Sequence, residues 1–198
     1  MDCPPCHPER APGKDRRGRR SLQWMREAFW IMKNFGEVFE MFRELLRKKQ
    51  KLPLEECIRI LKEEKRGILS VNGENGYPYG MPMNHWYNEA DGKLYFHCGN
   101  VGHRLDALKN DPRVSFCTYD KGCRKGDGWA LTVKSVIVFG KVEIVNDRER
   151  ITDIATKLSY KFTNDKEYIE KEIAQHAHRT LLLVLTPEHI CGKTVEES

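Results

Sequence analysis

The sequence predicts an α+β protein dominated by strands, with a closed or nearly closed β-barrel. About six segments with strand-like apolar patterns recur between residues 66 and 185, and short helical patterns separate some of them. A length of 198 residues favours a single core. No run of apolar residues is long enough to cross a bilayer, so we expect a soluble protein with no membrane span.

The charge of the chain is unevenly distributed. The formal net charge is +5, and the whole excess falls within residues 1–50, whereas the remainder carries equal numbers of basic and acidic residues. A neutral folded part argues against nucleic acid as its main partner. The seven cysteines are scattered and no signal peptide precedes them, so we expect mostly free thiols in a reducing cytoplasm.

One cysteine motif points to two kinds of metal chemistry. Cys3-Pro-Pro-Cys6-His7 matches the pattern for covalent haem attachment and also half of a zinc site. Haem attachment requires export, for which the sequence shows no signal, and zinc requires further ligands at a suitable spacing, which do not follow. We therefore expect no metal site.

Residues 1–40 are predicted to be a basic, partly disordered extension, and residues 41–198 the barrel domain. Residues 1–20 are rich in proline and arginine and too poor in apolar groups to order. From Ser21 to Lys49, apolar residues recur at three- and four-residue steps, which predicts an amphipathic helix with an interruption at a glycine. This helix could bind a membrane or a partner, or pack on its own domain; alternatively, the natural start is residue 41.

Four short helices are expected in the barrel domain, each from a capping residue, a first-turn proline or an apolar face of helical period. They cover residues 54–65, residues 101–109, residues 147–160 with Asp147 as the cap, and residues 165–176.

The expected strands are bounded by turn residues. Two aromatic-rich runs, residues 77–87 and 93–99, flank the turn Glu-Ala-Asp-Gly and are predicted to form one β-hairpin. Residues 129–145 are long for one strand and contain a glycine, which predicts a bent pair or a bulge at Phe139-Gly140. The remaining strands are residues 66–71, 113–119 and 180–185.

The loop after the hairpin combines features of an anion-binding site. Gly99, Asn100, Gly102 and Arg104 come directly after a strand and open a helical pattern. Backbone N–H groups at a helix start lack acceptors, and an arginine beside them can hold a phosphate through two hydrogen bonds. The sequence therefore predicts a cofactor that carries a phosphate.

Four motifs occur in a fixed order: Tyr77-Pro-Tyr-Gly-Met-Pro-Met-Asn84, Tyr95-Phe-His-Cys98 with Gly102-His-Arg104, Lys134-Ser-Val-Ile-Val-Phe-Gly140, and Thr186-Pro-Glu-His-Ile-Cys-Gly-Lys193. Together they resemble the pyridoxamine 5′-phosphate oxidase-like FMN-binding split-barrel superfamily, and within it the branch of the 5-nitroimidazole-resistance nitroreductases. The resemblance covers roughly residues 41–193. It implies a six-stranded Greek-key split β-barrel with peripheral helices, a homodimer, and FMN bound at the dimer interface.

The resemblance also implies roles for particular residues. Gly102, His103 and Arg104 would grip the FMN phosphate with help from Asn100, and His97 would lie beside the flavin as a proton source. The strand residues that would run along the isoalloxazine edge are Pro82, Met83 and Asn84.

Several other side chains keep two interpretations. Ser135 could hydrogen-bond the cofactor or present a solvated hydroxyl on a strand. His85 and Trp86 are adjacent on a strand and so face opposite sides, one toward flavin or substrate and the other toward the core or the dimer partner. Trp129 could cover the flavin ring or close the barrel, and His97 could instead be a core histidine.

One departure from the family concerns the substrate. Oxidases of the vitamin B6 pathway hold a substrate phosphate with an arginine-rich motif and further basic residues near the C-terminus. Here the first strand reads Met-Pro-Met-Asn-His-Trp, and only Lys193 remains near the end. A pyridoxamine phosphate oxidase activity is therefore not expected.

The predicted function is that of an FMN-dependent oxidoreductase, in which a reduced nicotinamide or other donor supplies electrons to a small acceptor such as a nitroaromatic or a quinone. The chain lacks a Gly-x-Gly-x-x-Gly dinucleotide fold, so the donor would bind only transiently. The alternative is a non-catalytic protein that stores or senses flavin or haem, with His85, His97 or His103 as a haem ligand.

Overall fold

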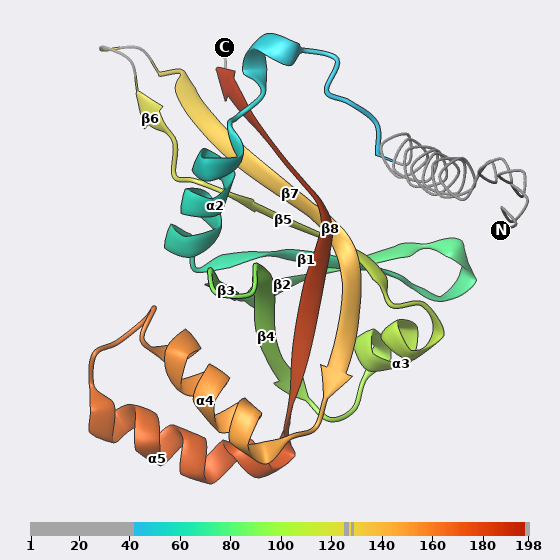
Figure 1. Ribbon diagram of the computed structural model, residues 1–198, viewed down its shortest axis with the longest axis vertical. Coiled ribbons are helices and arrows are strands. Elements are labelled where there is room, and N and C mark those ends of the chain that lie inside the picture. The colour runs from blue at the N-terminus through green and yellow to red at the C-terminus, as the bar shows by residue number, and fades with distance from the viewer. Residues whose placement is uncertain (1–41, 125–126, 128, 197–198) are drawn as a thin grey trace, which may run out of the picture. The chain divides into compact units, whose positions relative to one another are not determined.

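The computed structural model describes residues 42–124, 127 and 129–196 (Figure 1). The chain forms two compact units, Met1–Glu44 and Leu45–Ser198, and the second unit holds the sheet and the core. The cysteine motif at residues 3–7, the basic extension and most of the predicted helix over residues 21–49 lie outside the described residues. The described end of that helix was predicted wrongly, because residues 42–47 are not helical.

The centre of the fold is one antiparallel sheet of eight strands, counted over the described residues, in the order β2-β1-β5-β7-β8-β4-β3 with β6 beside β7. This sheet curls into a split barrel (Figure 1). The strands are β1 (Arg66–Asn72), β2 (Pro78–Asn84), β3 (Trp86–Asn88), β4 (Lys93–Gly99), β5 (Arg113–Tyr119), β6 (Cys123–Arg124), β7 (Leu131–Val145) and β8 (Thr180–Glu196). Six strands were expected, and the two additional ones, β3 and β6, have three and two residues.

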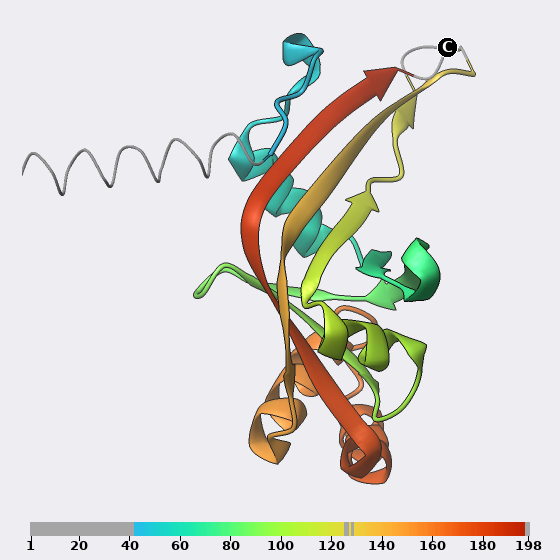
Figure 2. The ribbon, with the colours of Figure 1, turned by 90° about the vertical axis from the view of Figure 1, so that its right-hand side faces the viewer.

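The paired strands β7 and β8 run side by side along the sheet (Figure 2). Their register shifts between Phe139 and Gly140, which confirms the predicted bulge and makes the segment one strand rather than two. The predicted end of the last strand at Leu185 was wrong, because β8 continues to Glu196. Pro187 and the polar residues after it break the apolar pattern, but their backbone pairs with β7 and so extends the strand beyond it.

The predicted hairpin is divided between two strand pairs. Its first run breaks at His85, so that β2 pairs with β1 while the short β3 pairs with β4. The alternation of apolar residues continues through the break, which is why the sequence suggested one strand. The break allows consecutive segments to join opposite edges of the sheet.

The helices lie near their predicted positions, at α2 (Leu54–Glu63), α3 (His103–Asn110), α4 (Arg148–Ser159) and α5 (Lys166–His176). The carboxylates of Asp147 and Asp165 cap α4 and α5 by accepting hydrogen bonds from the N–H groups of Arg150 and Tyr168. Short 3-10 turns occupy Lys48–Gln50, Glu74–Gly76 and Ala177–Arg179. No helix within the described ranges is both long and apolar enough to span a membrane.

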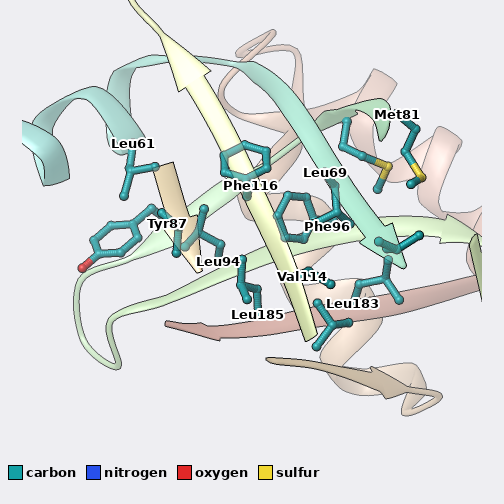
Figure 3. Close-up of a cluster of buried hydrophobic side chains, with 14 of the residues drawn as sticks. Leu61, Leu69, Met81, Tyr87, Leu94, Phe96, Val114, Phe116, Leu183 and Leu185 are labelled. Carbon is teal, nitrogen blue, oxygen red and sulfur yellow. The ribbon is translucent and has the colours of Figure 1, made fainter. Parts of the chain in front are cut away.

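Two clusters of buried apolar side chains hold these elements together. The larger cluster fills the barrel, and the fully buried rings of Phe96 and Phe116 meet edge to face in it at 5.2 Å between centroids (Figure 3). The smaller cluster joins β4, β7 and β8 to α4 through residues that include Tyr95 and Ile151. Successive residues of β4 therefore point alternately into the barrel and toward α4.

Gly140 is required by the close approach of β7 and β8 at the bulge. A Cβ atom at this position would lie 2.1 Å from the carbonyl oxygen of Thr186. We expect Gly140→Ala to lower the free energy of unfolding by about 1–3 kcal/mol, as overpacking does elsewhere, in urea denaturation. The control is Gly99→Ala, since a Cβ at Gly99 meets no atom within 4 Å. An equal effect of both substitutions would contradict this account.

Candidate functional site

Arg104, in the first turn of α3, reaches across to β2. Its side chain is half-buried, and one terminal nitrogen donates a hydrogen bond to the sulfur of Met83. The Nε atom of Arg104 is buried and has no hydrogen-bond partner among the described residues. A buried guanidinium N–H without an acceptor is costly, so this atom indicates a missing anionic or polar partner.

The loop before α3 leaves room for such a partner. Gly102 is the N-cap residue and has φ 127°, a conformation that L side chains rarely adopt. A Cβ atom at Gly99 or at Gly102 would meet nothing within 4 Å, so the space over the loop is open. The first N–H groups of a helix have no acceptor within the helix, and its N-terminus favours negative charge. These features fit a phosphate.

A second contact between α3 and β2 fixes the loop. The rings of His103 and Tyr79 are stacked, with 4.5 Å between their centroids. Tyr79 and Met83 lie on the same face of β2 because side chains alternate along a strand. The adjacent residues His103 and Arg104 therefore both rest on one face of this strand.

His97 lies on β4 and points away from the barrel interior, toward α4 and α5. Its ring is exposed at the wall of a cavity of about 360 Å³ that Asn84 also lines. Partial burial lowers the pKa of His97, and the charge of Arg104 lowers it further. His97 is therefore mainly neutral at pH 7 and keeps one N–H donor and one acceptor.

Pro82 lies on the opposite face of β2 from Met83. With Ile68 and Tyr119 it lines a second, open hollow of about 610 Å³ on the outer face of the sheet. Ile68 is 40% exposed and Tyr119 is 64% exposed, so this face presents apolar side chains to solvent.

Ser135 lies away from the loop in the single chain. It pairs with Lys193 in β8, whereas His97 pairs with Leu182 of the same strand. This separation corresponds to roughly 30 Å along β8 at the usual rise per residue. The structure thus brings residues 82–84, 97 and 100–104 together and leaves Ser135 apart.

The expectation that one of His85 and Trp86 faces the flavin is not met for His85. His85 is fully buried in the barrel, its Nε2 lies 2.8 Å from the carbonyl oxygen of Leu61, and its ring is 4.8 Å from that of Phe116. It is therefore unavailable as a haem ligand, and that suggestion was wrong. Trp86 packs on Tyr95, with 5.5 Å between ring centroids. Trp129 is 72% exposed.

Sequence reasoning missed two components of the site. Tyr79 was quoted only as part of a motif, although its two-residue spacing from Met81 and Met83 places it on the same strand face. The walls that α4 and α5 give to the cavity were also missed. No sequence signal could have placed them beside His97, since this depends on how the helices pack.

An antiparallel sheet curled into a split barrel, with an anion-binding helix start at one edge, defines the class of this protein. The family model described as pyridoxamine 5′-phosphate oxidase matches residues 53–194. The chain belongs to this family, which confirms the resemblance inferred from the four motifs. A comparison with curated proteins found no match.

Solved structures with this fold support the assignment. A Bacteroides thetaiotaomicron protein assigned to 5-nitroimidazole antibiotic resistance has 18% identity and a TM-score of 0.61, with 74% of this chain and 87% of that one covered. A flavocytochrome from Azotobacter vinelandii has 16% identity and a TM-score of 0.61, with coverages of 77% and 72%. A FAD-binding protein from Mesorhizobium loti has 22% identity and a TM-score of 0.52, with coverages of 74% and 97%. At these identities the similarity concerns the fold.

The burial of His85 makes stability depend on pH. Burial is the main cause that lowers the pKa of His85 from 6.5 to about 3, and the charge of Lys161 adds to it. Between these values the unfolded chain binds a proton that the folded chain does not, so stability falls as pH falls below 6.5.

We expect the wild type to lose about 1 kcal/mol more than His85→Gln between pH 7 and pH 5.5 in urea unfolding. The other histidines whose pKa is lowered, His97 and His189, titrate in both proteins and cancel in the comparison. Equal losses in the two proteins would show that His85 is not held neutral.

Proposed function

We propose that this protein is an FMN-binding oxidoreductase that reduces a small acceptor such as a nitroaromatic or a quinone. The observation that carries the proposal is the buried, unpartnered Nε of Arg104 beside a glycine-containing helix start. Family membership supports it, as do structural neighbours whose names include a FAD-binding protein and a flavocytochrome.

The phosphate would be held by Arg104, by the N–H groups at the start of α3 and by the side chain of Asn100, which is exposed beside them. Gly102 permits close approach of the ligand because a side chain there would be strained and would fill the open space. The stack of His103 on Tyr79 keeps the loop in position, so little ordering is needed when the ligand binds.

The residues around the ring would position it and control a proton. The backbone of Pro82, Met83 and Asn84 would run along the ring edge. Bound flavin would supply hydride and electron transfer between a reduced nicotinamide and the acceptor. His97, neutral near pH 7, would donate the proton of its N–H to the reduced acceptor and recover it from solvent.

A homodimer would complete the site. The exposed apolar residues Ile68 and Tyr119 lie on the outer face of the sheet beside Pro82, and an apolar hollow of this kind is typical of a protein interface. Ser135 is too far from the loop of its own chain, so we assign it to the flavin held by the second copy. The absence of the arginine-rich substrate motif argues against pyridoxamine phosphate as the substrate.

Replacement of Arg104 by alanine tests the proposal. Loss of a charge-assisted contact of about 1.5–3 kcal/mol weakens FMN binding by roughly 10- to 100-fold. The measurement is the visible spectrum of the purified full-length protein, followed by titration with FMN. Lys109→Ala is the matched control, because Lys109 is a largely exposed cation on the same helix, paired with Asp106.

The wild type is expected to be yellow and to bind FMN, Lys109→Ala to behave like it, and Arg104→Ala to lose flavin. Arg104→Lys keeps the charge but lacks the forked geometry, so an intermediate affinity is expected. A colourless wild type that ignores FMN, or a protein with a haem band, would exclude the proposed function.

The proposed domain boundary can be tested separately. All residues assigned to the flavin lie between residues 82 and 135, and the family model begins at residue 53. A protein that lacks residues 1–40 is therefore expected to bind FMN with the affinity of the full chain, within about twofold by titration. Loss of binding would place part of the flavin site in the N-terminal segment.

A further inference from the structure

The cavity next to His97 has an apolar wall built by the two helices of the C-terminal half (Figure 1). Its volume of about 360 Å³ is at the lower end of the range for small-molecule sites and suits a molecule of one or two rings. The apolar lining comes from α4, α5 and the segment between them and includes Ile151, Ala155, Leu158, Phe162, Ile169 and Ile173.

The position of the cavity connects it to the proposed flavin site. Asn84 is the last residue of β2, the strand against which Arg104 and His103 rest, and Asn84 and His97 both line the cavity. A flavin that follows β2 from its phosphate at α3 would therefore end with its ring at the mouth of this cavity. The cavity lies beyond the ring, on the side of α4 and α5.

The charge of the cavity is unusual for this basic protein. Its lining contains one carboxylate, Glu172, and neither lysine nor arginine. Arg179 donates to Nδ1 of His176 at 2.7 Å, because a guanidinium cannot accept a hydrogen bond. His176 is then neutral with its proton on Nε2, which lies 3.6 Å from Glu172. An anionic ligand would meet a carboxylate and no compensating cation.

We infer that this cavity between α4, α5 and His97 binds the electron acceptor and selects uncharged aromatic molecules over anionic ones. The inference rests on the proposed function and adds to it the place and the chemical class of the acceptor. The apolar wall removes the ring from water, while Asn84 and His97 present N–H donors at the open end to a nitro or carbonyl oxygen.

The matched probes are 4-nitrotoluene and 4-nitrobenzoate, which share the reacting nitro group and differ in charge. Conversion of a nitro group to a nitroso group and water takes two electrons and two protons; oxidation of NADH supplies the electrons, together with one proton, and the second proton comes from solvent. The test measures probe binding by ligand-observed NMR with the full-length protein, both without FMN and loaded with it, and then the KM with NADH.

Ala155→Leu fills the cavity from α4, and Thr152→Leu adds the same side chain at an exposed position of the same helix. We expect 4-nitrotoluene to bind the wild type at least tenfold more tightly than 4-nitrobenzoate does. Ala155→Leu should weaken 4-nitrotoluene binding at least tenfold and raise its KM, with FMN affinity unchanged within twofold, whereas Thr152→Leu should change neither. Glu172→Gln, which alters charge without bulk, should narrow the preference for the neutral probe.

Equal binding by the wild type and Ala155→Leu, or tighter binding of 4-nitrobenzoate, would overturn the inference. Loss of FMN from a folded Ala155→Leu protein would also overturn it, because the cavity would then hold the flavin itself. If Ala155→Leu fails to fold, Glu172→Gln decides: an unchanged preference contradicts the inference. If the wild type does not bind FMN, the proposed function fails, and the probe measurements without FMN still test the cavity.

Discussion

The pairing of β7 with β8 is the constraint on which the rest of the barrel depends. One half of the sheet, β5, β1 and β2, continues from β7, and the other half, β4 and β3, continues from β8. The bulge at Phe139-Gly140 lets the long pair bend, and the close contact of Gly140 with Thr186 leaves no room for a side chain there. The bend brings the two edges of the sheet toward each other.

The candidate site occupies the gap between these edges. The chain crosses from β2 to β3 at His85, whose ring is held in the barrel by the carbonyl of Leu61. Near this crossing, Arg104 and His103 from the segment after β4 rest on β2, and Asn84 meets His97 at the cavity. A split barrel thus leaves polar groups from two edges beside each other without a ladder to satisfy them, which suits a bound cofactor.

The parts of the structure that depend on local signals could be predicted from the sequence. The caps at Asp147 and Asp165, the bulge at Gly140 and the helix start after Gly102 each follow from a residue and its neighbours. The break at His85 could not be predicted, because the alternation of side chains continues through it. The distance of Ser135 from the loop and the cavity beside α4 and α5 depend on long-range pairing and packing, which local patterns do not contain.

The position of β8 in the sheet bears on how the protein is made. This strand comes last in the chain but lies between β7 and β4, and the outer strands on both sides depend on it. During synthesis, the pairing edges of β4 and β7 stay open until β8 has left the ribosome, because no earlier segment can take its place. Open strand edges favour association between chains, so the newly made polypeptide is most exposed to aggregation immediately before it is complete.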